Sequence, residues 1–252
     1  MDKDFKFSPA VIGLPLFFVL FLWFIYWLQI RFDFDFIENG IYPRTFSGLQ
    51  GVFFSPFIHS DLGHLYNNSL PLLVLLAALQ FFYAKESFTV IFYGIIFSGL
   101  GTWAIGRSSY HIGASGLVYV LFSYIFFKGM FVKHYRLVAL SLTVILVYGG
   151  MIWFVFPKID EVISWEGHLS GFLVGFFMAF VQKTEPYQKT IKYDWEHPDY
   201  DPSEDKFMQR FDQNGNFVNL PKPEPEFYFY SDWNVNYTII PSEIEGDTEA
   251  NF

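Results

Sequence analysis

The sequence contains no cysteine and few charged residues. The absence of cysteine excludes disulfide bonds, thiolate metal ligands and a cysteine nucleophile. Charged residues make up only 16% of the 252 residues, whereas hydrophobic residues make up 52% and aromatic residues 23%. Soluble globular domains usually carry about 25% charged residues. The composition therefore indicates an integral membrane protein rather than a soluble domain.

The few charges are unevenly distributed along the chain. Residues 1–183 contain 11 Lys and Arg against 10 Asp and Glu, a net charge of +1. Residues 184–252 contain 5 against 15, a net charge of −10. The net charge of −9 for the whole chain thus comes from its C-terminal part. Because the chain lacks a basic stripe that would bind a phosphate backbone, nucleic-acid binding is not expected.

Six apolar segments are candidates for membrane-spanning helices. A hydrocarbon core about 30 Å thick requires about 20 apolar residues in a helix, which satisfies its own backbone hydrogen bonds. The segments are residues 9–30, 62–82, 88–105, 112–131, 137–156 and 168–181. The first has no small-residue cleavage site and is too long and aromatic for a signal peptide. The sixth is short, so it is either a re-entrant helix or a span that extends back through Trp165.

Six spans place both termini on the same side of the membrane. With that side cytoplasmic, the cytoplasmic connections carry seven Lys and Arg and the opposite side carries four, in keeping with the positive-inside rule. The sequence thus predicts a short cytoplasmic N-terminus (1–8), a membrane domain (9–183) and an acidic cytoplasmic tail (184–252). We expect the tail to be partly disordered, with a small hairpin at 227–240. The membrane is expected to be a bacterial-type plasma (inner) membrane.

Polar side chains gather in the outer half of three predicted spans. His64 and Asn68 are four residues apart in the second span, so they share a helix face. Ser115 lies near the outer end of the fourth span and His168 near that of the sixth. Intramembrane polar residues are expensive and by default indicate function or hydrogen bonding between helices. We expect these residues to meet at one depth in the bundle.

This set of residues supplies the groups that a serine hydrolase needs. Ser115 at a helix start is the candidate nucleophile and His168 the candidate base. The His64 ring, the Asn68 amide and the Ser115 N–H are candidate donors to the developing oxyanion, because first-turn N–H groups have no partner within their helix. His59 is expected near the water interface, either as part of the site or as a loop histidine that positions the chain.

Glycines near these residues are expected to let backbones approach closely. Gly113 and Gly116 flank the candidate nucleophile, whereas Gly171 and Gly175 follow the candidate base on one helix face. Small residues at this spacing allow membrane helices to touch. The sixth span should therefore press against the fourth and bring the imidazole to the hydroxyl.

Three segments together resemble the rhomboid family of intramembrane serine proteases. They are 59-HSDLGHLYNN-68, 113-GASG-116 followed by Tyr119, and 168-HLSGFLVG-175, and their order, spacing and assignment to spans all agree with the family. The resemblance covers roughly residues 10–182. One departure is the first loop, where 47-SGLQGVFFSPFIH-59 lacks the Trp-Arg pair that many rhomboids carry, so the loop must be anchored differently.

The resemblance implies a six-helix rhomboid-like bundle that hydrolyses peptide bonds in or near transmembrane helices of other membrane proteins. It implies a dyad of Ser115 and His168, an oxyanion hole of His64, Asn68 and the Ser115 N–H, and packing of Tyr119 against the catalytic imidazole. It implies no metal and no cofactor. Expected partners are transmembrane-helix substrates and lipid, and the oligomeric state stays open.

Alternative interpretations remain. A serine among glycines is usually a packing residue, and a His and an Asn also tie helices together. The chain is alternatively a catalytically inactive rhomboid-like protein that binds membrane helices, although such relatives usually lose the serine or the histidine. A transporter is disfavoured because, apart from Asp61, the spans carry no carboxylate. His111 and Arg107 are expected to have no role in the site.

Overall fold

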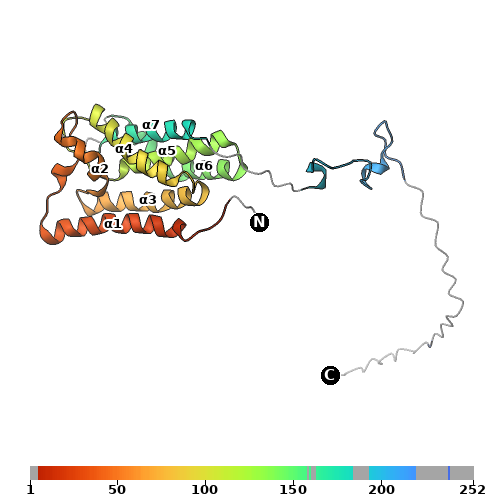
Figure 1. Cartoon of the computed structure of the whole chain (residues 1–252), viewed down its shortest axis with the longest axis horizontal. Coiled ribbons are helices and arrows are strands. Elements are labelled where there is room, and N and C mark those ends of the chain that lie inside the picture. The colour runs from red at the N-terminus through yellow and green to blue at the C-terminus, as the bar shows by residue number, and fades with distance from the viewer. Residues whose placement is uncertain (1–4, 158, 160–162, 184–192, 220–237, 239–252) are drawn as a thin grey trace, which may run out of the picture. The chain divides into compact units, whose positions relative to one another are not determined.

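The structure is a computed structural model that describes residues 5–157, 159, 163–183, 193–219 and 238 (Figure 1). The chain divides into two compact units, Met1–Thr190 and Ile191–Phe252. The first unit contains α1 (Ala10–Phe32), α2 (Gly51–Phe54), α3 (Leu62–Phe82), α4 (Ser87–Ile105), α5 (Ser115–Val132), α6 (Tyr135–Tyr148) and α7 (Trp165–Val181). Short 3₁₀ turns complete it: η1 (Ile37–Asn39), η2 (Ser47–Gln50), η3 (Ser55–Phe57) and η4 (Gly149–Val155).

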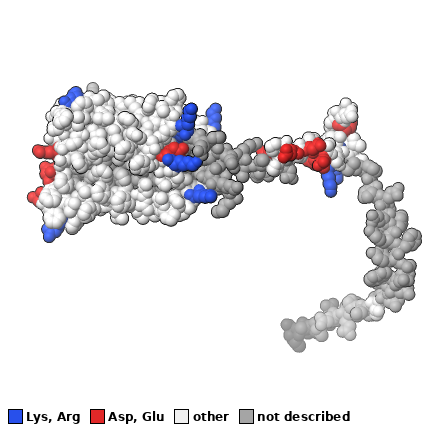
Figure 2. Space-filling view, in the orientation of Figure 1, with Lys and Arg blue, Asp and Glu red and all other residues white. Residues whose placement is uncertain are grey.

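The first unit is a polytopic α-helical membrane bundle. Five helical segments are long and apolar enough to cross a membrane, namely α1, α3, α4, α5 and α6 continued through η4, and α7 is a shorter apolar helix of 17 residues. Figure 2 shows the charged side chains at the two ends of the bundle, with an uncharged band between them. The predicted fold class is confirmed. The fourth predicted span starts later than expected, at Ser115, because Gly113 adopts a positive φ of 102° that ends the preceding turn.

Helix α5 forms the centre of the bundle. In its apolar stretch 61% of the residues are buried, against 22% in α1, and it packs against α3, α4, α6 and α7 (Figure 1). A helix surrounded by other helices offers its first turn a position shielded from lipid. Ser115, as the first residue of α5, takes such a position.

Helices α5 and α7 pack closely because glycines on α7 face the α5 backbone. A Cβ added to Gly171 would overlap the carbonyl oxygen of Gly116, and one added to Gly175 would overlap that of Val120. The expected clearance by Gly171 and Gly175 is therefore confirmed. The same expectation is wrong for Gly116, because a Cβ there would meet Ser98 Oγ at 3.6 Å, an ordinary van der Waals distance.

The first loop is anchored to the end of α4 by an arginine and a tryptophan outside the segment 47–59. Arg44 Nη1 donates to the carbonyl oxygen of Gly106 at 2.7 Å, and Trp103 Nε1 donates to that of Thr45 at 2.8 Å. An isolated antiparallel bridge between Ile41 and His111 joins the same loop to the segment that leads into α5. These contacts provide the different anchoring that the missing Trp-Arg pair required.

The second unit contains two short 3₁₀ turns, η5 (Asp194–Glu196) and η6 (Met208–Arg210), and a bridge between Phe211 and Phe217. A turn closes this bridge at Gly215, whose φ is 81°. The hairpin predicted at 227–240 lies, except for residue 238, outside the described residues.

Candidate active site

Ser115 is the first residue of α5, at the end of a fixed loop. The Gly113 N–H donates to the carbonyl oxygen of Ser55 at 2.8 Å, which holds the turn before the serine against η3. As the first residue of the helix, Ser115 has a backbone N–H without an intrahelical acceptor. The hydroxyl and the N–H of one residue are thus both available at the same place.

The imidazole of His168 is held on two sides. Its Nδ1 lies 3.1 Å from the carbonyl oxygen of Phe154, and its ring stacks on the Tyr119 ring with centroids 4.2 Å apart and an angle of 16°. The Tyr119 hydroxyl in turn donates to the carbonyl oxygen of Met151 at 2.7 Å. Because a carbonyl oxygen only accepts, Nδ1 carries the ring hydrogen, and Nε2 of the neutral ring keeps a free lone pair.

Tyr119 lies one helical turn after Ser115, so its stacking holds the His168 ring near the start of α5. Among the described residues, no hydrogen bond joins the Ser115 hydroxyl to His168. In enzymes without substrate, catalytic hydrogen bonds are often long and tighten only when the substrate binds.

His64 and Asn68 lie against the loop that precedes Ser115. A Cβ built on Gly113 would lie 2.5 Å from His64 Nε2 and 3.5 Å from Asn68 Nδ2, so both side chains reach the backbone at this glycine. Asn68 is buried, and its Nδ2 has no hydrogen-bond partner among the described residues. A buried amide that keeps a free donor costs free energy unless a ligand accepts from it.

The hydrogen on His64 depends on Ser60. The Ser60 hydroxyl lies 3.2 Å from His64 Nδ1 and 2.7 Å from Asp61 Oδ2. It carries one hydrogen, which it donates either to the carboxylate or to the ring. When Ser60 donates to Nδ1, the ring hydrogen is on Nε2, and His64 then presents a donor toward Gly113.

His59 is buried rather than close to water, so the expected position of this residue is wrong. It is fully buried, and its ring contacts that of His64 edge-to-face with centroids 5.0 Å apart. Burial, followed by the charge of His64, lowers the pKa of His59 to about 3. The Phe57 backbone opposes this shift without forming a full hydrogen bond, because neither ring nitrogen has a partner among the described residues. His59 is therefore a neutral packing neighbour of His64.

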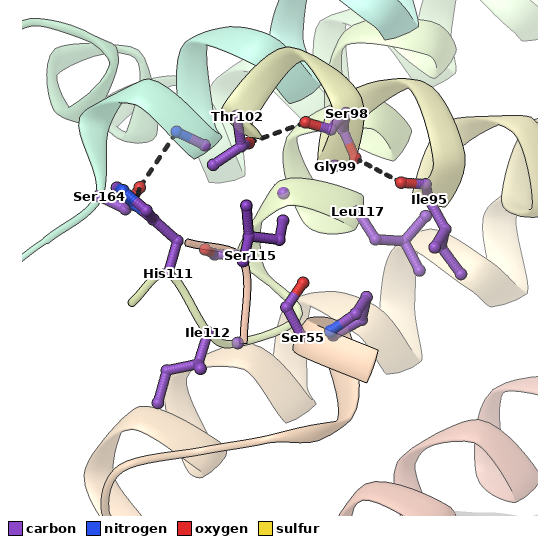
Figure 3. Close-up of a pocket in the computed structure, with 15 residues that line it drawn as sticks. Ser55, Ile95, Ser98, Gly99, Thr102, His111, Ile112, Ser115, Leu117 and Ser164 are labelled. Carbon is purple, nitrogen blue, oxygen red and sulfur yellow. Dashed lines mark hydrogen bonds between the residues drawn. The ribbon is translucent and has the colours of Figure 1, made fainter. Parts of the chain in front are cut away.

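A small polar cavity opens beside Ser115 (Figure 3). Its wall includes the side chains of Ser55, Ser98, Thr102, His111, Ser115 and Ser164. The cavity offers about 30 Å³, enough for roughly two waters at about 10–15 Å³ each. Within the described part of the chain, no three His, Asp or Glu side chains gather closely enough to hold a metal ion.

Two groups near the site escaped the sequence analysis. Glu166 lies in the first turn of α7 with its side chain buried, so the expectation that the spans carry no carboxylate apart from Asp61 is wrong. Its place in the sequence, directly before Gly167 and His168, already indicated a carboxylate close to the candidate base. The Phe154 carbonyl oxygen had no signal, because a backbone acceptor carries no sequence identity.

Arg107 and His111 contact the start of α7, the helix that carries His168. The Arg107 N–H donates to Glu166 Oε1 at 3.0 Å, and His111 Nδ1 lies 2.6 Å from Ser164 Oγ. Burial lowers the pKa of His111, which favours the neutral ring. The ring hydrogen then lies on Nε2, which donates to the Arg107 carbonyl oxygen at 3.0 Å.

Asp61 caps the helix that carries His64 and Asn68, and its removal should weaken that helix. Its Oδ1 accepts from the His64 N–H at 2.9 Å. We expect Asp61→Ala to lower the free energy of unfolding by about 0.5–2 kcal/mol, the usual effect of losing an N-cap. Thermal unfolding in detergent measures this loss, with the exposed Glu38→Ala as the control.

The pH dependence of this cap has a defined sign. The hydrogen bond from the His64 N–H, followed by that from Ser60, lowers the pKa of Asp61 below its usual value of 3.8. The stabilisation is therefore fully present above about pH 4 and is lost as the pH falls through the lowered pKa. A cap whose loss costs the same at pH 3 as at pH 7 would contradict this assignment.

Comparison with known proteins gives a consistent family. Residues 47–184 match the Rhomboid domain. Uncharacterized proteins of Mycobacterium bovis and Mycobacterium tuberculosis are 38% identical over 156 residues, which cover 57% of this chain and 63% of theirs. An uncharacterized protein of Mycobacterium leprae is 32% identical over 161 residues, covering 61% of this chain and 63% of its own. The alignments thus span less than two thirds of these relatives. The Rhomboid match covers more than half of the chain and includes all three motifs, so the chain belongs to the rhomboid family.

Proposed function

We propose that this protein is an intramembrane serine endopeptidase that hydrolyses peptide bonds in or near transmembrane segments of other membrane proteins. One observation carries the proposal: the His168 ring is stacked on Tyr119, one turn from Ser115, with Nδ1 bound to a carbonyl oxygen and no hydrogen bond at Nε2 from any described residue. That arrangement supplies a serine with an oriented base, which is the minimum for nucleophilic catalysis.

In the first step, Ser115 Oγ attacks the scissile carbonyl carbon while its proton moves to His168 Nε2. The ring then carries two hydrogens, and Nδ1–H stays bound to the Phe154 carbonyl oxygen. This carbonyl takes the orienting part that a carboxylate plays in a Ser-His-Asp triad. The imidazolium next gives its Nε2 proton to the leaving amine, the peptide C–N bond breaks, and an acyl ester remains on Ser115.

The negative oxygen of the tetrahedral intermediate is stabilised by donors around Gly113. The Ser115 N–H and Asn68 Nδ2 are the available groups, and His64 Nε2 joins them only in the tautomer in which Ser60 turns its hydrogen from Asp61 to His64 Nδ1. Loss of one such donor typically costs about 10²–10³-fold in rate. The unpartnered amide of Asn68 supports this role because the free donor gains its acceptor only when the oxyanion forms.

A water then hydrolyses the acyl ester, with His168 Nε2 as the base. The polar cavity beside Ser115 offers space and hydroxyl acceptors for a water that reaches the ester from the Ser115 side, since His168 itself does not line this cavity. The starts of α3, α5 and α7, which carry the site, would face the outer side of the membrane, and both termini would lie in the cytoplasm. We propose a bacterial-type plasma (inner) membrane as the location and lateral access for a substrate helix.

The test is covalent labelling of the purified full-length chain with a fluorophosphonate in detergent. We expect wild-type protein to be labelled, and Ser115→Ala and His168→Ala to lose the label, because the first removes the nucleophile and the second its base. Labelling that persists in Ser115→Ala contradicts the assigned nucleophile. A folded wild type that neither labels nor cleaves a transmembrane reporter favours an inactive helix-binding relative instead.

A further inference from the structure

The segment that leads into Ser115 and the segment that leads into His168 are tied to each other directly. Arg107, in the first segment, donates its backbone N–H to Glu166 Oε1 at 3.0 Å. Its Nη2 donates to the carbonyl oxygen of Ile163 at 2.8 Å. One arginine thus holds the chain on both sides of the position where α7 begins, Trp165.

A second tie runs through His111 and Ser164. His111 Nδ1 lies 2.6 Å from Ser164 Oγ, and that oxygen accepts the Gly167 N–H at 3.2 Å as the N-cap of α7. His111 Nε2 donates to the Arg107 carbonyl oxygen at 3.0 Å, which links this second tie to the first. With the hydrogen on His111 Nε2, His111 Nδ1 accepts the Ser164 hydroxyl hydrogen. Each donor in this series of hydrogen bonds therefore meets an acceptor. We call Arg107, His111, Ser164 and Glu166 the clasp.

The Arg107–Glu166 pair is an expensive way to stabilise a fold. The Glu166 side chain is 2% exposed and the Arg107 side chain 38%, and Arg107 Nε lies 3.9 Å from Glu166 Oε1. The other carboxylate oxygen, Oε2, is buried and has no hydrogen-bond partner among the described residues. Replacing a buried ion pair by apolar residues of similar size is often neutral or stabilising, because removing the two charges from water costs free energy. The free energy of unfolding therefore does not explain why the chain has this ion pair.

The position of the pair near His168 and Ser115 explains it better. Glu166 and Ser164 lie two and four residues before His168, and the loop that holds them runs directly into Ser115. We propose that the clasp, and the Arg107–Glu166 pair in particular, positions the His168 imidazole relative to the Ser115 hydroxyl; this inference rests on the proposed function. The four clasp residues are positioning residues, because they act through the helix start and not on the substrate. A displacement of about 1 Å in such a geometry can cost about 10²-fold in rate.

The test compares four variants of the full-length chain in liposomes with a transmembrane reporter substrate. In Arg107→Met/Glu166→Met we expect the unfolding temperature and KM to stay near wild type while kcat falls about 10- to 100-fold. Glu166→Gln keeps an acceptor for the Arg107 N–H and should recover part of kcat. Arg107→Met alone leaves a buried carboxylate without its cation and should also lower the unfolding temperature.

Arg44→Met is the matched control, because Arg44 binds carbonyl oxygens of Ala104 and Gly106 at the end of α4 and, among the described residues, forms no hydrogen bond or ion pair with the start of α7. Its kcat should change far less than that of the double variant. Unchanged kcat in a folded double variant overturns the proposal. So does an equal fall in Arg44→Met, because loop anchoring alone would then explain the effect.

A second measurement separates this inference from the proposed function. Hydrogen exchange at the amides of residues 164–168 should be faster in the double variant than in wild type or Arg44→Met, whether or not the protein cleaves anything. Absence of labelling and cleavage in wild type refutes the proposed function alone. Unchanged exchange in the double variant refutes the clasp, even if wild type is a protease.

Discussion

Ser115→Ala and His168→Ala are each expected to reduce cleavage of a reconstituted transmembrane substrate by about 10⁴-fold or more. Alanine at 115 removes the oxygen that forms the acyl ester, and alanine at 168 removes the base that Phe154 and Tyr119 hold in place. Initial rates from gel-resolved cleavage products, with protein and substrate in the same liposomes, measure the loss.

The two substitutions should also be non-additive. Because nucleophile and base act as a unit, the double variant should be no less active than either single variant. Ser47→Ala and His197→Ala remove the same residue types at exposed positions that are not among the candidate site residues, and they should keep wild-type rates. Substantial cleavage by Ser115→Ala would refute the serine mechanism, and a double variant far below both singles would show that the two residues act independently.

Gly171→Ala is expected to destabilise the bundle and to disturb the candidate site at the same time. A Cβ at this position would overlap the Gly116 carbonyl oxygen and lie 3.1 Å from Tyr119 Cβ, so α7 must move away from α5. Overpacking of this kind costs about 1–3 kcal/mol or more when backbone must shift. We therefore expect a lower unfolding temperature in detergent together with loss of fluorophosphonate labelling, because the same movement carries His168 away from Ser115.

Gly13→Ala is the matched control for this prediction. Gly13 lies in α1, and nothing lies within 4 Å of a Cβ added there. The substitution should be neutral or slightly stabilising, because alanine favours the helix over glycine by about 1 kcal/mol. If Gly171→Ala were as stable and as well labelled as Gly13→Ala, the close packing of α5 and α7 would not be what positions the base.

Family membership does not decide between an active protease and an inactive relative that binds membrane helices. The two differ in whether Ser115 becomes nucleophilic when a substrate arrives, since no hydrogen bond joins it to His168 among the described residues. Glu166 is a buried carboxylate in α7, so a lack of carboxylates in the spans does not exclude a transporter. Its close partner is Arg107, however, and within the described residues no three His, Asp or Glu side chains gather closely enough to hold a metal ion.

The sequence by itself determined the fold class, the positions of the helices and the choice of candidate residues. Segment 62–82 matches α3 at both ends, and 88–105 matches α4 to within one residue. These features are encoded locally: a bilayer sets the length of an apolar run, and the spacing of His64 and Asn68 sets their common face. The order and spacing of the three motifs then indicated Ser115 as the candidate nucleophile and His168 as the candidate base.

Only the tertiary structure decided how those residues are held. The acceptor for His168 Nδ1 is a backbone carbonyl at Phe154, the ring of His59 is buried behind His64, and Gly116 has room for a methyl group whereas Gly171 has none. Arg107 and Glu166, 59 residues apart, meet because α7 packs against both α4 and α5. Such contacts depend on distances between segments far apart in the chain. Hydropathy and spacing report each segment separately, so they cannot specify which backbone atom a neighbouring helix presents.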